Sequence, residues 1–448
     1  MSTVSSKSSA HVFILPYPAP GHIIPILDLT HQLLTRGLTI TILVAPTTLS
    51  LVEPLLSNYP SSLKHLLLPF PQLPSTTKFR PIAYMRSMQQ LFDPIIQWFQ
   101  SHTSPPVAII SDSLLGGTHL LTSMLGVPRV IFSSSGAFEF SISSKIWQDI
   151  PKGDNNPSDE NSLISFPKIP NSPNYPWWQE CFKNSMLANL DEWGILINSF
   201  SVLEGVYLDP LKRELGHDKV RAVGPLLPTK DDLVGPVQRG GSHSCQKVMT
   251  WLDKRTNGSV VYVCFGSRVV PTRKQMNELA TALECIGVQF IWCVCDGHVG
   301  GDYGVVSNGF EDRWVPQVAI LRHRAVGTFL THCGWNSVLE GLSAGVVMLT
   351  WPINGDQFTN AKLLVDQLGV SIRVGVGGGS DNVPNSAELG RLLAKSVDEN
   401  DTLPETDRAM RMRDAALSAV TGNSKRDLDE FVGRLHNKLN DFFFFFLI

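Results

Sequence analysis

With 448 residues, 43% of them hydrophobic and 17% charged, the chain is long enough to form two or three soluble domains with ample cores. A formal net charge of −3 leaves no basic footprint for nucleic acid or an anionic membrane surface, and no apolar run approaches the roughly 20 residues of a membrane span. Seven cysteines without paired spacing and a polar start at residues 1–10 indicate reduced thiols and no signal peptide, so we expect a cytoplasmic protein.

The first elements along the chain are a strand at 11–15, a turn with Gly21, a helix that ends at Gly37, and a strand at 38–44. His22 lies in the turn, at the carboxyl end of the first strand. A histidine at a helix start is more often structural or solvated when it is taken alone. At this strand end, however, the helix N-terminus would disfavour the imidazolium, so His22 could serve as a neutral base.

An acidic residue follows another buried strand. The strand at 107–110 delivers Asp112 at its carboxyl end. The usual interpretation of such an aspartate is a turn residue or a helix cap. If Asp112 shares a sheet edge with His22, its carboxylate could instead hold the imidazole in one tautomer and stabilise its charged form.

Two polar stretches separate the parts of the chain. Residues 151–178 are rich in Pro, Ser and Asn without periodicity, and we interpret them as a surface loop. Residues 229–244 are polar and Gly-rich and form the best candidate linker. Beyond the linker, a strand at 259–265 ends in Gly266 and Ser267, a small turn and a hydroxyl that could approach a phosphate.

The segment 314–357 contains one parallel, right-handed strand–helix–strand unit. Its strands are predicted at 326–331 and 346–351. The helix between them is predicted to begin with a capping box, Ser337-Val-Leu-Glu340, and to end at Gly345.

Polar residues of this unit gather at the ends of the strands, where open α/β sheets bind ligands. Residues 332–337 lie between a strand and the helix N-terminus, whose free N–H groups and partial positive charge suit a phosphate. Asp356 and Gln357 follow the second strand and could grip hydroxyl groups, and the indole of Trp314 could stack on a base. The pattern indicates a nucleoside diphosphate that carries a hydroxylated group.

This stretch resembles the signature box of the plant UDP-glycosyltransferases, and its spacing from Trp314 to Gln357 fits that box without a gap. Other family-like stretches extend the resemblance over nearly the whole chain. The resemblance implies an α/β fold of the GT-B type, with two Rossmann-like β/α/β domains facing across a cleft that holds the active site. The implied bounds are residues 1–228 for the acceptor-binding domain, 229–247 for the linker, 248–425 for the UDP-sugar-binding domain, and 426–448 for a C-terminal helix that packs back on the first domain, with an apolar tail.

The resemblance also implies roles for individual residues. His22 and Asp112 would form a catalytic dyad in which His22 removes a proton from the acceptor hydroxyl. The implied donor site consists of Ser134 facing the sugar, Trp314 stacked on uracil, Gln317 and Glu340 on the uridine, Ser267, His332, Asn336 and Ser337 on the phosphates, and Trp335, Asp356 and Gln357 on the sugar.

The implied reaction moves a sugar from UDP to a hydroxyl of a small plant phenolic such as a flavonol, with inversion, without a bound cofactor and without a metal. UDP-glucose is the leading donor because Asp356-Gln357 resembles the glucose-using pattern, while UDP-rhamnose and UDP-xylose stay open. The loop at 151–178 would border the acceptor pocket. The expected partners are the UDP-sugar and the phenolic acceptor, with no nucleic acid and no membrane span, and we expect a monomer.

The segment before Trp314 departs from the family pattern. Residues 296–313 contain only Val305-Val306 as strand material, and Gly309-Phe-Glu-Asp-Arg313 runs directly into Trp314 where the family has a short strand. Either residues 304–307 replace that strand, or the chain is a catalytically impaired relative that binds UDP-sugar weakly or not at all.

Local order argues against two other enzyme classes. Gly341-Leu-Ser-Ala-Gly345 matches a serine-hydrolase motif, but that motif needs a strand before the serine and a helix after it, which is the reverse of the order here. No Gly-x-Gly-x-x-Gly follows the first strand, so a Rossmann oxidoreductase is poorly supported.

Overall fold

The computed structural model describes residues 9–71, 87–148, 163–164, 175–176, 187–228, 242–267, 269–285, 287–293, 309–312, 315–374, 383–400 and 403–445. The chain divides into two compact units, one made of residues 1–226 and 420–448 and the other of residues 227–419. We call them unit 1 and unit 2.

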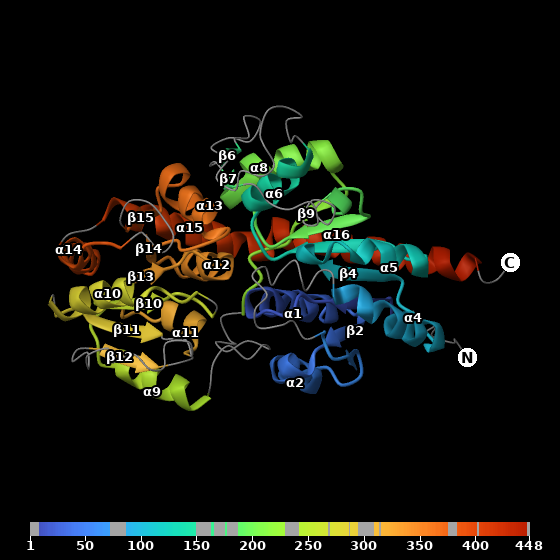
Figure 1. Cartoon of the computed structure of the whole chain (residues 1–448), viewed down its shortest axis with the longest axis horizontal. Coiled ribbons are helices and arrows are strands. Elements are labelled where there is room, and N and C mark those ends of the chain that lie inside the picture. The colour runs from blue at the N-terminus through green and yellow to red at the C-terminus, as the bar shows by residue number, and fades with distance from the viewer. Residues whose placement is uncertain are drawn as a thin grey trace, which may run out of the picture. The chain divides into compact units, whose positions relative to one another are not determined.

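Unit 1 is built on a seven-stranded parallel sheet with the strand order β3-β2-β1-β4-β5-β8-β9. Figure 1 labels β2, β4 and β9 of this sheet. The strands are β1 (His11–Leu15), β2 (Thr39–Val44), β3 (Leu63–Leu67), β4 (Ala108–Asp112), β5 (Arg129–Ser133), β8 (Gly194–Ile197) and β9 (Val220–Ala222). β1 pairs with β2 on one side and with β4 on the other, so the strand order reverses between β1 and β4. Such a switch point is where doubly wound sheets bind ligands.

Helices connect these strands. The helices of unit 1 are α1 (Pro20–Leu34), α2 (Leu49–Asn58), α4 (Phe92–Ser101), α5 (Thr118–Leu125), α6 (Ala137–Gln148), α8 (Ser201–Leu215) and α16 (Asn423–Phe445), with short 3₁₀-helices η1 (Pro46–Thr48), η2 (Met88–Leu91) and η3 (Ser113–Leu115). Within the predicted surface loop, β6 (Leu163–Ile164) pairs antiparallel with β7 (Tyr175–Pro176), and the other residues of 151–178 lie outside the described ranges.

The apolar runs of the sequence form the central strands of unit 1. Every residue of β1, β4 and β5 is buried, as expected for parallel strands that are covered on both faces. α1 begins with Pro20, whose missing N–H costs nothing at the first helical position. The chain leaves this helix through Gly37, whose φ of 83° favours glycine. The predicted strand, helix and strand at the start of the chain are confirmed, but Gly21 and His22 lie in the first turn of α1 and not in the turn that precedes it.

The last helix, α16 (Asn423–Phe445), belongs to unit 1 although it comes at the end of the chain. Its Asp429 accepts a hydrogen bond from Nε of Arg36 at 2.7 Å. Its Asp427 accepts from the backbone N–H of Ala222 at 3.1 Å. These contacts hold the helix against the turn after α1 and against β9.

Unit 2 is built on a six-stranded parallel sheet with the order β12-β11-β10-β13-β14-β15. The strands are β10 (Val260–Cys264), β11 (Gln289–Cys293), β12 (Gly309–Asp312), β13 (Val326–Thr331), β14 (Val347–Thr350) and β15 (Ser371–Arg373). The helices are α9 (Ser242–Asp253), α10 (Arg273–Cys285), α11 (Gln317–Leu321), α12 (Trp335–Ala344), α13 (Gln357–Lys362) with its π-helical extension η5 (Leu363–Gln367), α14 (Ser386–Ser396) and α15 (Pro404–Thr421). The predicted strand–helix–strand unit is confirmed as β13, α12 and β14.

The edge strand β12 corrects a prediction from the sequence. Residues 309–312 form this strand and pair in parallel with β11. The expectation that 296–313 provides no strand apart from Val305-Val306 is therefore wrong, because main-chain hydrogen bonding at a sheet edge does not require an apolar run. The candidate replacement at 304–307, and Trp314 itself, lie outside the described residues.

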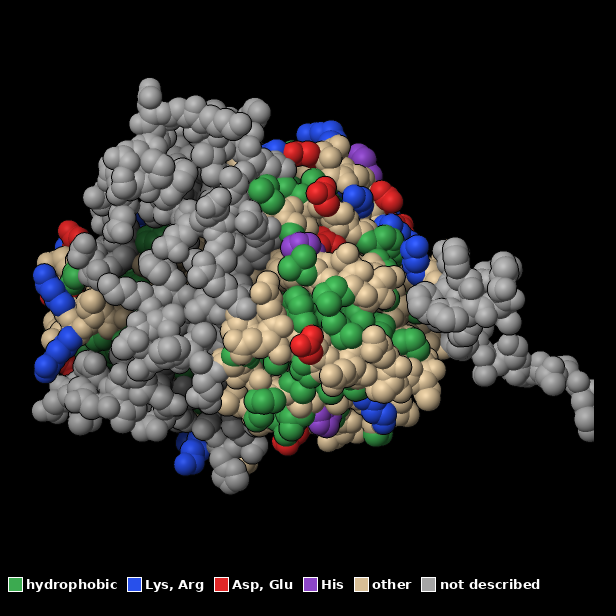
Figure 2. Space-filling view, turned by 45° about the vertical axis from the view of Figure 1, so that its right-hand side comes forward, with side chains coloured by type: hydrophobic (Ala, Val, Ile, Leu, Met, Phe, Trp, Pro, Cys, Tyr) green, Lys and Arg blue, Asp and Glu red, His purple; other side chains and the backbone are tan. Residues whose placement is uncertain are grey.

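Three predictions from the sequence concern the linker, a membrane span and a basic surface. Residues 229–241, which make up most of the predicted linker, lie outside the described ranges. No described helix is long and apolar enough to cross a membrane. On the face drawn in Figure 2, basic and acidic side chains of the described residues are interspersed and do not gather into a basic patch.

We expect Gly327→Ala to lower the melting temperature of the protein. A Cβ atom on Gly327 would lie 2.1 Å from the backbone carbonyl oxygen of Gly258, and overpacking of this kind costs about 1–3 kcal/mol. Gly433→Ala in α16 is the matched control, because a Cβ there meets no described atom within 4 Å and removes a helix-weakening glycine. Thermal unfolding followed by circular dichroism would check this, and equal melting temperatures for the two variants would contradict the close strand contact.

Candidate active site

The two catalytic side chains predicted in unit 1 come together at the carboxyl edge of its sheet. His22 lies in the first turn of α1, and Asp112 is the last residue of β4. Nδ1 of His22 lies 2.8 Å from Oδ2 of Asp112. The Asp112 side chain is fully buried, whereas the His22 side chain is 22% exposed, so the imidazole remains accessible to a ligand.

The surroundings of Asp112 determine which nitrogen of His22 carries the proton. Oδ1 of Asp112 accepts from the backbone N–H of Leu114 at 2.9 Å, which makes Asp112 the N-cap of η3. Oδ2 then faces Nδ1 of His22, and we assign the imidazole proton to that nitrogen. Nε2 of the neutral ring is left with a lone pair, so the arrangement is that of a histidine base oriented by a carboxylate.

Ser134 lies at the same imidazole nitrogen. It follows β5, is buried, and places its Oγ 2.9 Å from Nδ1 of His22. The N–H of Nδ1 is therefore shared between the Asp112 carboxylate and the Ser134 hydroxyl oxygen. The family resemblance implies that Ser134 faces the donor sugar, and that contact stays a prediction.

The predicted donor residues of unit 2 lie in loops at one edge of its sheet and in the helices that follow them. β10, β13 and β14 are adjacent strands. The loops at their carboxyl ends carry Ser267, which is exposed, His332, which is buried, and Asp356, which is partly exposed. The helix that follows β13 begins with Trp335, which is buried, and Asn336, which is half-buried. Trp314 lies outside the described residues.

The N-terminus of α12 differs from its prediction. The N-cap is Gly334, and no side chain caps the helix. The predicted capping box is therefore wrong, because the side chains of Ser337 and Glu340 hydrogen-bond to Gln317 instead. Because the N-cap residue is a glycine without a side chain, the partial positive charge of this N-terminus can act on an anion.

His332 is held tightly between two glycines. A Cβ atom on Gly266 would lie 2.6 Å from Nε2 of His332, and one on Gly334 would lie 2.5 Å from it. Burial lowers the pKa of His332 from 6.5 to about 4, against the opposing effect of a hydrogen bond with the backbone of Cys264. Its Nδ1 is buried and has no hydrogen-bond partner among the described residues. A neutral imidazole with such a nitrogen fits a site where a ligand supplies the missing partner.

The next residue, Cys333, has a left-handed backbone with φ of 65°, a conformation that costs about 1–3 kcal/mol in a residue other than glycine. Its N–H donates to Oγ1 of Thr331 at 3.1 Å, and its carbonyl accepts from Nδ2 of Asn360 at 2.9 Å. Nδ2 of Asn360 also donates to Oδ2 of Asp356 at 3.0 Å. Asn360 therefore ties the turn after β13 to the carboxylate that follows β14.

The side chain of Gln317 is bonded within unit 2. Its Oε1 accepts from the hydroxyl of Tyr262 at 3.0 Å. Its Nε2 donates to Oγ of Ser337 at 3.0 Å and to Oε2 of Glu340 at 2.6 Å. Burial, and secondarily Cys264, raise the pKa of Tyr262 well above 10, so the phenol stays a neutral donor. A hydrogen bond from Nε2 of Gln317 to a ligand would have to replace one of these bonds, whereas Oε1 has a second lone pair that could accept from a ligand.

Gln357 shapes the turn that precedes it. Its Oε1 accepts from the backbone N–H groups of Ile353 and Asn354, both at 2.9 Å. Its Nε2 donates to Oδ1 of Asn354 at 2.9 Å. The second hydrogen of this amide has no acceptor among the described residues and is the group that Gln357 can offer to a sugar hydroxyl.

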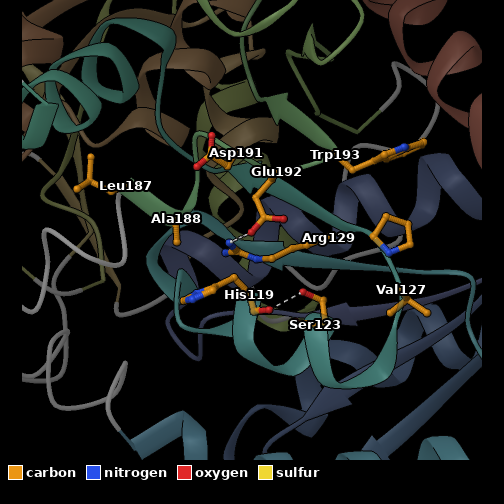
Figure 3. A pocket seen from close by; sticks show the side chains of 11 residues that line it. His119, Ser123, Val127, Arg129, Leu187, Ala188, Asp191, Glu192 and Trp193 are labelled. Carbon is orange, nitrogen blue, oxygen red and sulfur yellow. Dashed lines mark hydrogen bonds and ion pairs between the residues drawn. The ribbon is translucent and has the colours of Figure 1, made fainter.

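A cavity of unit 1 lies apart from these residues. It is open, has a volume of about 500 Å³, and lies between α5 and the segment 187–193 (Figure 3). Its lining includes His119, Arg129 and Glu192 but neither His22 nor Asp112.

Comparison with known proteins decides the family. A family described as UDP-glucoronosyl and UDP-glucosyl transferase matches residues 224–381. UDP-glycosyltransferase 89B2 of Stevia rebaudiana is 46% identical to this chain, over 96% of this chain and 98% of its own length. The chain belongs to the plant UDP-glycosyltransferase family. Flavonol 3-O-glucosyltransferase UGT89B1 of Arabidopsis thaliana is 44% identical over 96% of both chains.

Solved structures of plant UDP-glycosyltransferases have the same fold. The crystal structure of Arabidopsis thaliana UGT89C1 complexed with UDP-L-rhamnose matches with a TM-score of 0.79 and 33% identity, covering 96% of this chain and 100% of that one. The crystal structure of Medicago truncatula UGT71G1 complexed with UDP-glucose matches with a TM-score of 0.83 and 25% identity, covering 96% and 98%. The predicted family, the predicted GT-B fold class and the predicted activity of a UDP-dependent glycosyltransferase are confirmed.

Sequence reasoning missed two residues that organise the edge of unit 2 where the predicted donor residues lie. Asn360 follows Asp356 by four residues, and that helical spacing is a signal from which their hydrogen bond could have been predicted. Tyr262 lies in an apolar strand and resembles any core aromatic residue until the fold brings it to Gln317.

We expect Gly266→Ala to weaken the binding of UDP by about tenfold or more. The added Cβ would displace the imidazole of His332 from its place among the predicted donor residues. Gly287→Ala is the matched control, because Gly287 has a similar positive φ of 64° but its Cβ would meet no described atom within 4 Å. Both variants carry the same backbone strain, and only Gly266→Ala moves His332. Isothermal calorimetry with UDP would check this, and equal dissociation constants would show that His332 is not needed for UDP binding.

Proposed function

We propose that this protein transfers a sugar from a UDP-sugar to a hydroxyl of a small plant phenolic, a flavonol in the first place, with inversion at the anomeric carbon. The acceptor class is supported by the names of its relatives, which include Flavonol 3-O-glucosyltransferase UGT89B1 and Flavonol 7-O-rhamnosyltransferase of Arabidopsis thaliana. It is also supported by the structure of UGT89C1 complexed with quercetin.

The observation that carries the proposal is the 2.8 Å hydrogen bond between Nδ1 of His22 and Oδ2 of Asp112. It supports a His22 whose Nδ1 proton points at Asp112 and whose Nε2 removes the proton of the acceptor hydroxyl. A phenol has an ordinary pKa of about 10, so it needs such a base at neutral pH, and a positioned base contributes about 10²–10⁴-fold. The activated oxygen attacks the anomeric carbon opposite the leaving UDP, which inverts the configuration. Asp112 stabilises the imidazolium that forms.

On the donor side, the negative charge that develops on the leaving UDP would be stabilised by the uncapped N-terminus of α12. The proposed donor contacts are Trp314 with uracil, Gln317 and Glu340 with the uridine, Ser267, His332, Asn336 and Ser337 with the phosphates, and Ser134, Trp335, Asp356 and Gln357 with the sugar. Because these neutral donors and the helix dipole would meet the phosphate charge, we propose that no metal is required, and we expect a chelator to leave turnover unchanged.

We propose UDP-glucose as the preferred donor. The relative named as a glucosyltransferase is 44% identical to this chain, and the relative named as a rhamnosyltransferase is 37% identical. UDP-L-rhamnose is the main alternative, because UGT89C1 has been solved in complex with it. UDP-xylose is a third candidate.

We further propose that the protein is an active enzyme, that it is cytoplasmic and that it is a monomer. The alternative of a catalytically impaired chain was based on the apparent absence of a strand before Trp314, and the pairing of β12 with β11 supports an active enzyme instead. Cys264, Cys285, Cys293 and Cys333 are free thiols, which supports a cytoplasmic location.

Donor and acceptor are tested together by incubating the protein with quercetin and, in separate reactions, UDP-glucose, UDP-L-rhamnose and UDP-xylose, with and without a chelator. Mass spectrometry of the products would identify the sugar. We expect the glucoside to predominate. A predominant rhamnoside would establish the alternative donor, and UDP binding without any product across a panel of flavonols would contradict the proposed acceptor class.

We expect His22→Ala to lower turnover by about 10²–10⁴-fold while UDP binding stays nearly unchanged, because the base is lost and the donor residues of unit 2 are not altered. His31→Gln is a matched control in the same helix, where His31 contacts the hydroxyl of Tyr59 at 3.1 Å rather than the dyad. Product formation and UDP calorimetry would be compared for both variants. Wild-type turnover in His22→Ala would rule out the proposed base.

A further inference from the structure

The turn that follows Asp112 is held in place by hydrogen bonds from the side chains of Asn189 and Thr118. Ser111 precedes Asp112 in β4, and residues 113–115 form η3 directly after it. The carbonyl of Ser113 accepts from Nδ2 of Asn189 at 2.8 Å. The carbonyl of Leu115 accepts from the hydroxyl of Thr118 at 2.6 Å. The backbone on the C-terminal side of Asp112 is thus anchored at two carbonyls.

Arg129 joins the two ends of this turn. It is the first residue of β5, and its side chain is fully buried. Its Nε donates to Oγ of Ser111 at 2.8 Å, and its NH2 group donates to the carbonyl of Leu115 at 3.1 Å. One planar guanidinium therefore spans from the residue before Asp112 to the last residue of η3. A lysine has a single nitrogen and could not hold both acceptors in this fixed geometry.

The third nitrogen of the Arg129 guanidinium, NH1, is bonded to a residue outside the dyad and its turn. Its NH1 group donates to Oε1 of Glu192 at 3.0 Å, and this ion pair forms part of the wall of the open cavity (Figure 3). Burial lowers the pKa of the guanidinium, and the carboxylates of Glu192 and, more weakly, Asp112 oppose that shift. The positive charge of Arg129 is therefore attracted to the Asp112 side chain as well as bonded to its turn.

Stability alone is a poor explanation for this arginine. Removing a guanidinium from water costs several kcal/mol, and buried ion pairs can often be replaced by apolar residues without loss of stability. The two remaining bonds of Arg129 both go to the five residues, 111–115, that contain the dyad carboxylate. Its place in the fold thus suits an effect on Asp112.

We propose that Arg129 is a positioning residue for sugar transfer. Its guanidinium fixes the turn at 111–115 and thereby the direction in which Asp112 presents Oδ2 to Nδ1 of His22. Arg129 does not touch a substrate or a reacting atom. The inference deepens the proposed function and rests on His22 acting as the base.

The first test compares Arg129→Lys with Arg221→Lys. Arg221 is the matched control, because it is also buried, lies in β9 of the same sheet, and donates to Glu430 at 2.9 Å, but it makes no bond to the turn at 111–115. For Arg129→Lys we expect kcat to fall by about 10- to 100-fold, the range for a misplaced supporting contact, with little change in the KM for UDP-sugar or in UDP binding. We expect Arg221→Lys to keep wild-type kcat.

The second test measures the hydrogen bond between His22 and Asp112 by NMR and does not depend on turnover. The hydrogen-bonded N–H proton of His22 should give a downfield resonance in proton NMR, assigned by its loss in His22→Gln. We expect this resonance to shift or disappear in Arg129→Lys and to be unchanged in Arg221→Lys. A residue that only stabilises the fold would not move it in a folded variant.

Ser111→Ala keeps the inference testable if Arg129→Lys does not fold. This variant leaves the arginine in place and removes the hydroxyl that accepts from its Nε and, at 3.0 Å, from the hydroxyl of Thr118. Thr118 keeps the carbonyl of Leu115 as an acceptor, so we expect kcat to fall by about two- to tenfold, with a shifted His22 resonance. Wild-type kcat and an unchanged resonance in the folded variants would overturn the inference, as would an equal loss in Arg221→Lys. If the wild-type protein transfers no sugar, the proposed function fails, and the NMR comparison still decides whether Arg129 positions the dyad.

Discussion

Both units depend on hydrogen bonding between parallel strands, because this pairing brings distant parts of the chain to one edge of a sheet. His22 and Asp112 are 90 residues apart in sequence and meet only because β1 and β4 are neighbours. The same pairing in unit 2 sets the loops after β10, β13 and β14 side by side. The chemistry of each unit is thus determined by strand order first and by side chains second.

Strand order explains why much of the site could be predicted from sequence. His22 and Asp112 each follow an apolar run, and carboxyl ends of parallel strands share an edge, so their meeting follows from the pattern. The prediction failed at β12, whose four residues contain a single apolar side chain and pair through their backbone. It failed again at the start of α12, where Ser337 and Glu340 match a local capping motif but bond to Gln317 from another helix. Local patterns cannot register a competing partner that is distant in sequence.

The residues that were missed share a physical character. Tyr262, Asn360 and Arg129 are buried polar side chains whose partners belong to other elements. In the sequence, Tyr262 and Arg129 have apolar or proline neighbours and nothing nearby indicates their hydrogen-bond partners, whereas the four-residue spacing from Asp356 is the one signal for Asn360. Each of them hydrogen-bonds to a predicted ligand-contacting residue or to the backbone or side chain of a residue near one. Sequence reasoning therefore identified candidate ligand-contacting residues and not the groups that orient them.

The position of α16 has a consequence for the order in which the protein folds as it is synthesised. Unit 1 is discontinuous, and unit 2 is made entirely between its two parts. When the ribosome has completed the seven strands of unit 1, the partners of Arg36 and of the backbone of Ala222 have not yet been translated. Phe431 and Leu435, which are buried in the finished protein, are also still to come. The nascent unit 1 must wait, with an uncovered apolar surface, until nearly the whole polypeptide has emerged.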